Sequence, residues 1–161
     1  MLEAATNAAR AVGVDVGCLH TEIKLTDAGP VVIEVNGRVG GGVPEMLAAA
    51  SGTDLLRLAL RLALGEPITI DGPLAAGCVA YLFYVHAPEA VSVIGSVEGL
   101  DELRAAPGVA EVALRRGPGT AVDWRDGNHG HVASILGTAP DHDALRAMMS
   151  LVAGTLRIRG A

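Results

Sequence analysis

The stretch VIEVNGRVGGG, residues 32–42, begins like a buried strand and then changes abruptly into polar residues and glycine. Glu34, Asn36 and Arg38 stand on every second residue, so a strand would present all three side chains on one face and turn Ile33 and Val35 into the core. A strand that served only for packing would not place a carboxylate, an amide and a guanidinium in a row. The pattern indicates that something polar lies against this face, and the glycines allow the backbone to come close to it.

The composition limits the class of protein. A chain of 161 residues is long enough for one domain, or for one domain and a small second one, with a buried core. The formal net charge of -6 argues against nucleic acid as a partner, because phosphate contacts need a basic surface. No signal peptide pattern and no apolar run of about 18 residues is present, so we expect a cytoplasmic protein without a membrane partner. Cys18 and Cys78 form no metal or disulfide pattern, and we interpret both as small buried side chains.

Hydrophobic periodicity predicts a mixture of helices and strands along the chain. The expected helices cover residues 2–13, 44–51, 52–65, 100–106 and 141–154, and the expected strands cover 16–26, 30–36, 78–86, 91–97, 108–116, 130–139 and 155–159. Leucines surround most of the helix over 52–65, so this helix is expected to be well buried. The order of the elements predicts an α+β fold with a largely antiparallel sheet. The Pro- and Gly-rich residues around 67–76 predict a connection between two parts, 1–66 and 77–161.

The first two strands predict a hairpin with like charges facing each other. If residues 27–29 form a three-residue turn, Thr26 pairs with Pro30, and counting then places Glu22 opposite Glu34. Two carboxylates that face each other across a hairpin destabilise it. A divalent cation between them would remove the conflict.

Further residues fit such a cation site. The same count places His20 opposite Asn36, whose amide oxygen would stand beside the carboxylates. Two carboxylates and an amide oxygen suit Mg²⁺ or Mn²⁺, with phosphate and water completing the shell. Arg38, one strand step further, would bring a planar fork to the anion. The alternative is a solvated face on which Lys24 pairs with one of the carboxylates.

Residues 20–67 resemble the C-terminal part of the ATP-grasp domain of carboxylate–amine ligases, in particular the group that includes L-amino-acid ligases. The matching positions are Glu22 on one strand, Glu34, Asn36 and Arg38 on the next, and then Gly41 and Gly42. Residues 77–161 resemble the smaller α+β lid-like subdomain of the same enzymes in outline. The resemblance implies that 1–66 form the C-terminal half of an ATP-grasp core with an antiparallel sheet and packed helices.

The resemblance also implies a reaction and a role for each matching residue. ATP phosphorylates a substrate carboxylate, an amine attacks the acyl phosphate, and ADP and phosphate leave. Glu22, Glu34 and Asn36 would hold Mg²⁺ at the ATP phosphates, and Arg38 would be the catalytic residue that stabilises the transferring phosphoryl group. Gly41 and Gly42 would help to hold the substrate carboxylate, and His20 would line the site.

The upstream nucleotide-binding half of such enzymes, with its two lysines, has no counterpart here, since Lys24 is the only lysine. We therefore expect a C-terminal portion that is inactive alone, that pairs with an N-terminal half in trans, or that forms a homodimer. One alternative is a non-catalytic interaction or regulatory module derived from such an enzyme. Another keeps the chemistry with a different acceptor, as in an ATP-grasp carboxylase.

A second cluster of metal-binding residue types is a weaker candidate. Residues 123–131 contain Asp123, Asp126, His129 and His131, but the RDGN sequence within them is typical of a turn. Arg115 and Arg116 are interpreted as a solvated strand end.

Overall fold

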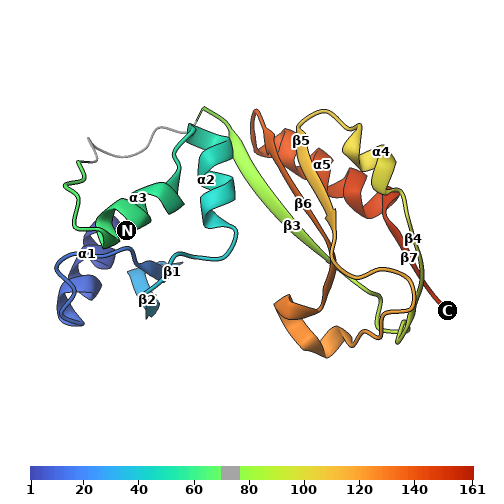
Figure 1. Cartoon of the computed structure of the whole chain (residues 1–161), viewed down its shortest axis with the longest axis horizontal. Helices are drawn as coiled ribbons and strands as arrows, with labels where there is room; N and C mark the ends of the chain where they lie inside the picture. Colours follow the sequence, from blue (N-terminus) through green and yellow to red (C-terminus); the bar gives the residue numbers. More distant parts are fainter. Residues whose placement is uncertain (70–76) are drawn as a thin grey trace. The chain divides into compact units, whose positions relative to one another are not determined.

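The computed structural model describes residues 1–69 and 77–161 (Figure 1). Residues 70–76, in the expected connection, lie outside the described residues. The chain divides into two compact units: Met1–Ala48 with Thr53–Leu74, and Ala49–Gly52 with Ala75–Ala161. The sequence-based division into domains at residues 66 and 77 remains a prediction.

Helices and strands follow one another along the chain in the order that the sequence pattern predicts, with the 3₁₀ segment η1 in addition. In chain order they are α1 (Leu2–Ala11), β1 (His20–Thr26), β2 (Gly29–Asn36), α2 (Val43–Ser51), α3 (Leu55–Ala63), β3 (Val79–His86), β4 (Ile94–Glu98), α4 (Leu100–Arg104), β5 (Val109–Leu114), the 3₁₀ segment η1 (Trp124–Gly130), β6 (His131–Ala139), α5 (His142–Thr155) and β7 (Arg157–Gly160). Every strand pairing between these elements is antiparallel. The predicted α+β class with antiparallel pairing is confirmed.

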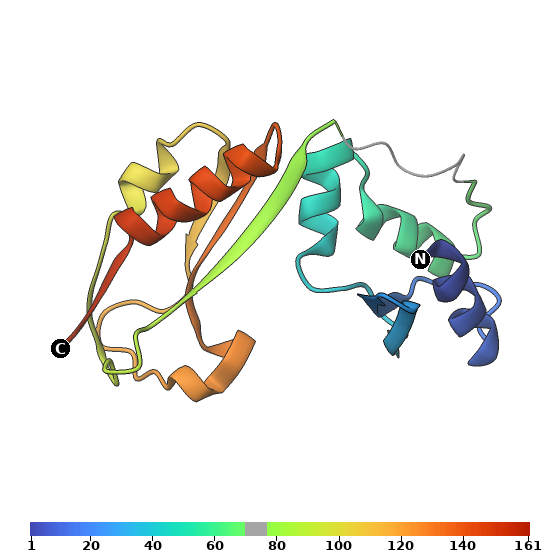
Figure 2. The ribbon, with the colours of Figure 1, turned by 180° about the vertical axis from the view of Figure 1, so that it is seen from behind.

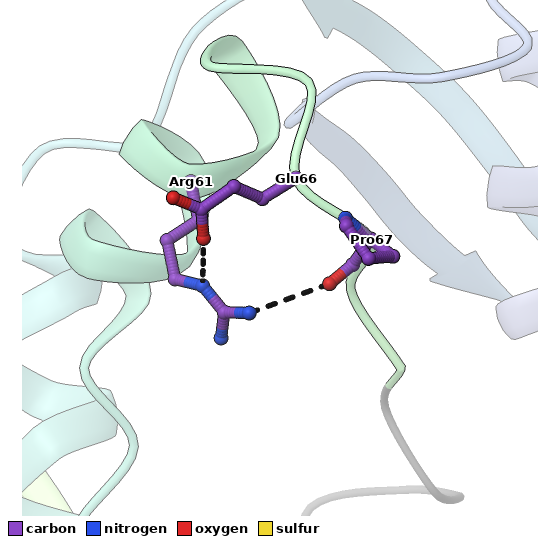
Figure 3. Close-up of polar contacts among 3 residues, drawn as sticks. All are labelled: Arg61, Glu66 and Pro67. Carbon is purple, nitrogen blue, oxygen red and sulfur yellow. Dashed lines mark hydrogen bonds and ion pairs between the residues drawn. The ribbon is translucent and has the colours of Figure 1, made fainter.

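The first unit contains α1, the β1–β2 hairpin, α2 as far as Ala48, and α3. The helix α3 begins after Asp54, whose carboxylate accepts a hydrogen bond of 2.9 Å from the backbone N–H of Arg57. In the last turn of α3, Arg61 Nε lies 2.7 Å from the carboxylate of Glu66, beyond the helix end, and Arg61 Nη2 donates to the Pro67 carbonyl at 3.4 Å (Figure 3). These contacts fix the chain as it leaves the helix.

The expectation that α3 is well buried is wrong. None of its residues is buried, and Leu60 keeps 62% of its surface exposed. Leucines on all sides of a helix become buried only where neighbours cover all sides, and here they cover one. On the covered side, Leu58 and Leu62 line an apolar pocket of about 370 Å³ together with Cys18. Cys18 and Cys78 are half-buried rather than buried.

The second unit is built on a three-stranded sheet in the order β3–β6–β5. The helices α4 and α5 lie side by side against one face of this sheet, and a second pair of strands, β4–β7, lies beside the helices (Figures 1 and 2). β6 is the central strand of the three, and because successive side chains point to opposite faces, its nearly continuous burial means that both of its faces are covered.

Two apolar clusters form the core of this second unit. Leu103 of α4 and Ile135 of β6 are completely buried in the first cluster, together with Val152 of α5. Ile94 and Val132 are completely buried in the second. The second unit therefore has the packed interior of a small folded domain. Among residues 1–69 and 77–161, no helix combines the length and the apolar character that a membrane crossing requires.

Candidate functional site

The hairpin has the predicted register at its far end and a different register near the turn. Glu22 pairs with Glu34 and His20 pairs with Asn36, as counting along the sequence predicts. The turn contains two residues rather than three, because Thr26 pairs with Gly29. The prediction that Thr26 pairs with Pro30 is therefore wrong.

A β-bulge reconciles the two ends of the hairpin. The register shifts between Glu22 and Ile23, so Ile33 is an extra residue on β2. Ile33 is 61% exposed, which corrects the expectation that it points into the core. Val35, the other side chain expected to point inward, is half-buried. A bulge re-aims the side chains beyond it, and here it brings the two glutamates opposite each other.

The two facing carboxylates have no partner in the described part of the chain. Glu22 and Glu34 are both exposed, and neither side-chain carboxylate forms a hydrogen bond or an ion pair with residues 1–69 or 77–161. Lys24, the alternative partner, lies opposite Val31 and forms no ion pair within the same ranges. The like-charge pair is thus not neutralised by the described side chains.

His20 and Asn36 leave buried polar atoms without hydrogen bonds. The Nδ1 atom of His20 and the Nδ2 atom of Asn36 are shielded from solvent and have no partner among the described residues. Nearly all buried polar atoms in folded proteins are hydrogen-bonded, so an unpaired atom requires an explanation. Two such atoms on one cross-strand pair, next to the glutamate pair, make this end of the hairpin the candidate site.

The loop of Gly40, Gly41 and Gly42, called here the glycine loop, packs directly on the hairpin through Gly40. This residue is buried, and a Cβ atom built on it would lie 2.7 Å from His20 Cδ2 and 2.8 Å from Val43 Cγ2. Sequence reasoning attached function to Gly41 and Gly42 and did not find this contact. A Cβ at Gly41 would meet open space, whereas Gly42 has a φ of +73° that favours glycine. Gly40 and Gly42 therefore have different structural reasons to be glycine, a close contact and a positive φ, and Gly41 has neither.

Arg38 lies just beyond the strand. The strand β2 ends at Asn36, so Arg38 stands in the bend that follows rather than one regular strand step further. Its guanidinium is exposed and donates one hydrogen bond, from Nη1 to the Val39 carbonyl at 3.1 Å. The remaining N–H groups are available to an anion. A role for Arg38 at the hairpin remains a prediction.

The donor set fits a hard divalent cation with few protein ligands. No group of three or more His, Cys, Asp or Glu side chains converges as a metal cluster within residues 1–69 and 77–161. The hairpin offers two carboxylates that face each other and one amide. Mg²⁺ typically takes one or two carboxylates and completes its shell with water and substrate phosphates. Glu22, Glu34 and Asn36 match this chemistry and do not match a closed structural metal site.

Comparison with known structures identifies the fold. The chain superposes on the L-amino acid ligase from Bacillus licheniformis with a TM-score of 0.88 and 23% sequence identity, covering 99% of this chain and 40% of that chain. The chain therefore has the fold of the C-terminal part of the ATP-grasp proteins. The predicted resemblance is confirmed.

Sequence comparisons match parts of the chain to a family model and to two curated proteins. Residues 86–160 match the family model L-amino acid ligase C-terminal domain 2. The uncharacterized protein y4rH of Sinorhizobium fredii is 30% identical over 137 residues, which is 84% of this chain and 28% of that protein. Carnosine synthase 1 of Gallus gallus is 41% identical over 68 residues, which is 42% of this chain and 7% of that protein. The chain thus spans less than a third of the length of these relatives.

Proposed function

We propose that this chain is the C-terminal portion of an ATP-dependent, ADP-forming carboxylate–amine ligase that acts through an acyl phosphate. The observation that carries the proposal is the pairing of Glu22 with Glu34, whose carboxylates have no partner among the described residues, with Asn36 two residues further along β2. The fold and the match of residues 86–160 support it independently. The cytoplasm is the location that we expect for such an enzyme.

Each residue of the hairpin has a role in this proposal. Glu22, Glu34 and Asn36 would hold Mg²⁺ or Mn²⁺, which supplies charge neutralisation at the ATP phosphates. The guanidinium of Arg38 would stabilise the transferring phosphoryl group, since phosphoryl transfer depends mainly on positioning and charge. The backbone N–H groups of Gly41 and Gly42, at the start of α2, would bind the substrate carboxylate. His20, held against Gly40, would position Asn36 across the strand.

Activity would require the nucleotide-binding half found upstream in ATP-grasp enzymes. The exposed apolar side chains of the first unit, among them Leu56 and Leu60 on α3, support a surface that such a partner covers, in cis or in trans. Alone, the chain is expected to bind metal weakly and to show no turnover. Homodimerisation through the same surface is the alternative use of these side chains.

Two functions are alternatives to the carboxylate–amine ligase. A non-catalytic module derived from an ATP-grasp enzyme would keep the fold and lose the cation. An ATP-grasp carboxylase would keep the hairpin and use another acceptor. Copurification of an ATP-grasp N-terminal half would distinguish a divided enzyme from a module.

The proposal is tested by calorimetric titration of the chain with Mn²⁺. Substitution of Glu34→Gln is expected to weaken binding at least tenfold, because it removes one of two carboxylates from the cation. Glu45→Gln is the matched control, since Glu45 is exposed on α2, outside the hairpin, and its loss changes the net charge equally.

The two variants also distinguish a cation site from a hairpin that keeps the carboxylates but no longer binds a cation. If Glu34→Gln binds Mn²⁺ as well as the unchanged chain and the Glu45→Gln control do, the hairpin is not the cation site. In that case Glu34→Gln is still expected to raise thermal stability by relieving repulsion with Glu22.

A further inference from the structure

A pocket of about 350 Å³ in the second unit gathers positively charged and hydrogen-bond-donating side chains. Its lining, called here the cationic pocket, consists of Tyr84, Arg115, Arg116, His129 and His131. The arginines follow the end of β5, and the histidines stand at the junction of η1 and β6. The interpretation of Arg115 and Arg116 as a merely solvated strand end is therefore incomplete.

One hydrogen bond to the surrounding protein fixes the position of each of the two arginines. Arg115 Nε donates to Ser134 Oγ at 3.3 Å, and Ser134, on β6, is only 5% exposed. Arg116 Nη2 donates to the backbone carbonyl of His129 at 2.8 Å. Each guanidinium uses one of its N–H groups in this way and keeps the others for a ligand.

The aromatic side of the pocket is also fixed. His131 Nδ1 lies 2.8 Å from the Asn128 carbonyl, which can only accept, so this nitrogen carries the proton. The ring of Tyr84 packs 4.7 Å from the ring of His131, measured between centroids. His131 Nε2 and the Tyr84 hydroxyl remain as polar groups for the pocket.

The charges of the pocket are not neutralised within the described residues. The ion pairs of the second unit engage other arginines: Arg104, Arg125, Arg146 and Arg159. In residues 1–69 and 77–161, neither Arg115 nor Arg116 forms an ion pair, and no carboxylate lines the pocket. The pocket therefore carries two formal positive charges in a chain whose net charge is -6.

We propose that the cationic pocket binds a phosphate group. Two guanidinium groups carry two formal positive charges, which match a phosphate dianion better than a single carboxylate. Arginine forks and a tyrosine hydroxyl can donate to several phosphate oxygens at once. The same two positive charges disfavour a cation at His129 and His131, which removes the metal alternative for this segment. The proposal does not depend on the hairpin or on the ligase reaction.

The test is a titration of the full chain with inorganic phosphate at constant ionic strength, followed through the NMR signals of the pocket. Phosphate is expected to bind, and Arg115→Gln is expected to weaken binding at least tenfold. Arg104→Gln is the matched control, because it removes the same charge from an arginine that pairs with Asp101 and lies outside the pocket lining.

Parallel titrations identify the source of the phosphate. Tighter binding of ADP than of inorganic phosphate would assign the pocket to a nucleotide, and the opposite order would assign it to the free ion. Equal binding of acetate and phosphate would overturn the proposal, as would equal phosphate binding by Arg115→Gln and the unchanged chain. Trp124, the only tryptophan of the chain and part of η1, reports whether each variant is folded. If Arg115→Gln does not fold, Arg116→Gln replaces it, with the same expected loss.

Discussion

The two units differ most in how they bury apolar side chains. In the second unit, Leu103, Ile135 and Ile94 are completely buried in two core clusters. In the described part of the first unit, no large apolar side chain is buried, and only Gly40 and Pro44 reach that class. The comparison indicates that the second unit carries most of the stability of the chain, since apolar burial is the main stabilising term.

The candidate cation site lies in the weakly packed unit. Its side chains are placed by a bulged hairpin and a glycine loop rather than by a surrounding core. Elements with few buried contacts open locally at a small free-energy cost. A ligand or a covering partner that binds this unit would therefore stabilise it disproportionately.

The largest expected contrast comes from two leucines on helices. Leu103→Ala, at a completely buried position in α4, is expected to lower the free energy of unfolding by about 2–5 kcal/mol. Leu60→Ala, at a largely exposed position in α3, is expected to change it by less than about 0.5 kcal/mol. Urea denaturation followed by the fluorescence of Trp124 in the second unit measures the first change. Equal losses in the free energy of unfolding for the two variants, followed by circular dichroism, would contradict the comparison.

A second contrast lies inside the glycine loop. Gly40→Ala is expected to cost about 1–3 kcal/mol locally, because the new methyl group collides with His20 and Val43. Gly41→Ala meets no neighbouring atom and serves as the control. The NMR signals of the His20 ring are expected to shift only in Gly40→Ala. A larger shift in Gly41→Ala would show that the loop is packed differently.

Much of the second unit could be predicted from its sequence, because its elements follow regular periods with clear ends. The helix over 141–154 starts at an aspartate cap, and β3 and β6 appear as apolar runs at nearly their observed limits. The facing of Glu22 and Glu34 was also predictable, since it follows from counting along two strands.

The remaining features depend on contacts that no local pattern encodes. The turn is one residue shorter than predicted, and the bulge at Ile33 adds one residue to β2. The two differences cancel, so Glu22 still faces Glu34. The exposure of Leu60 depends on what covers the helix, and the role of Gly40 depends on a side chain 20 residues away. The cationic pocket was missed because Arg115 and His131 meet only through strand pairing.

The N-caps of α5 and α3 give a smaller test of the difference in stability between the two units. The carboxylates of Asp141 and Asp54 accept hydrogen bonds of 2.8 and 2.9 Å from the backbone N–H groups of Ala144 and Arg57. Asp141→Ala is expected to lower the stability of the second unit by about 1 kcal/mol. Asp54→Ala is expected to loosen α3 without moving the urea midpoint reported by Trp124. A midpoint shifted equally by both variants would mean that the units unfold together.

The smallest effect concerns a buried tyrosine of the second unit. Burial raises the pKa of Tyr81, whose hydroxyl donates to the Gly108 carbonyl at 3.0 Å. Because the folded state holds this proton more tightly than the unfolded state, stability is complete below about pH 10 and falls as the pH rises further. Tyr81→Phe is expected to cost about 1 kcal/mol at neutral pH and to reduce the alkaline loss. An unchanged alkaline slope in the variant would assign that loss to other groups.

Amide hydrogen exchange with and without Mn²⁺ tests the central claim most directly, namely that stability lies in one unit and the cation site in the other. Without metal, the amides of β1 and β2 are expected to exchange at least about tenfold faster than those of β6. Mn²⁺ is expected to slow exchange in β1 and β2 and to leave β6 unchanged. Equal protection of the hairpin and β6 without metal, or a hairpin that does not respond to Mn²⁺, would contradict the account.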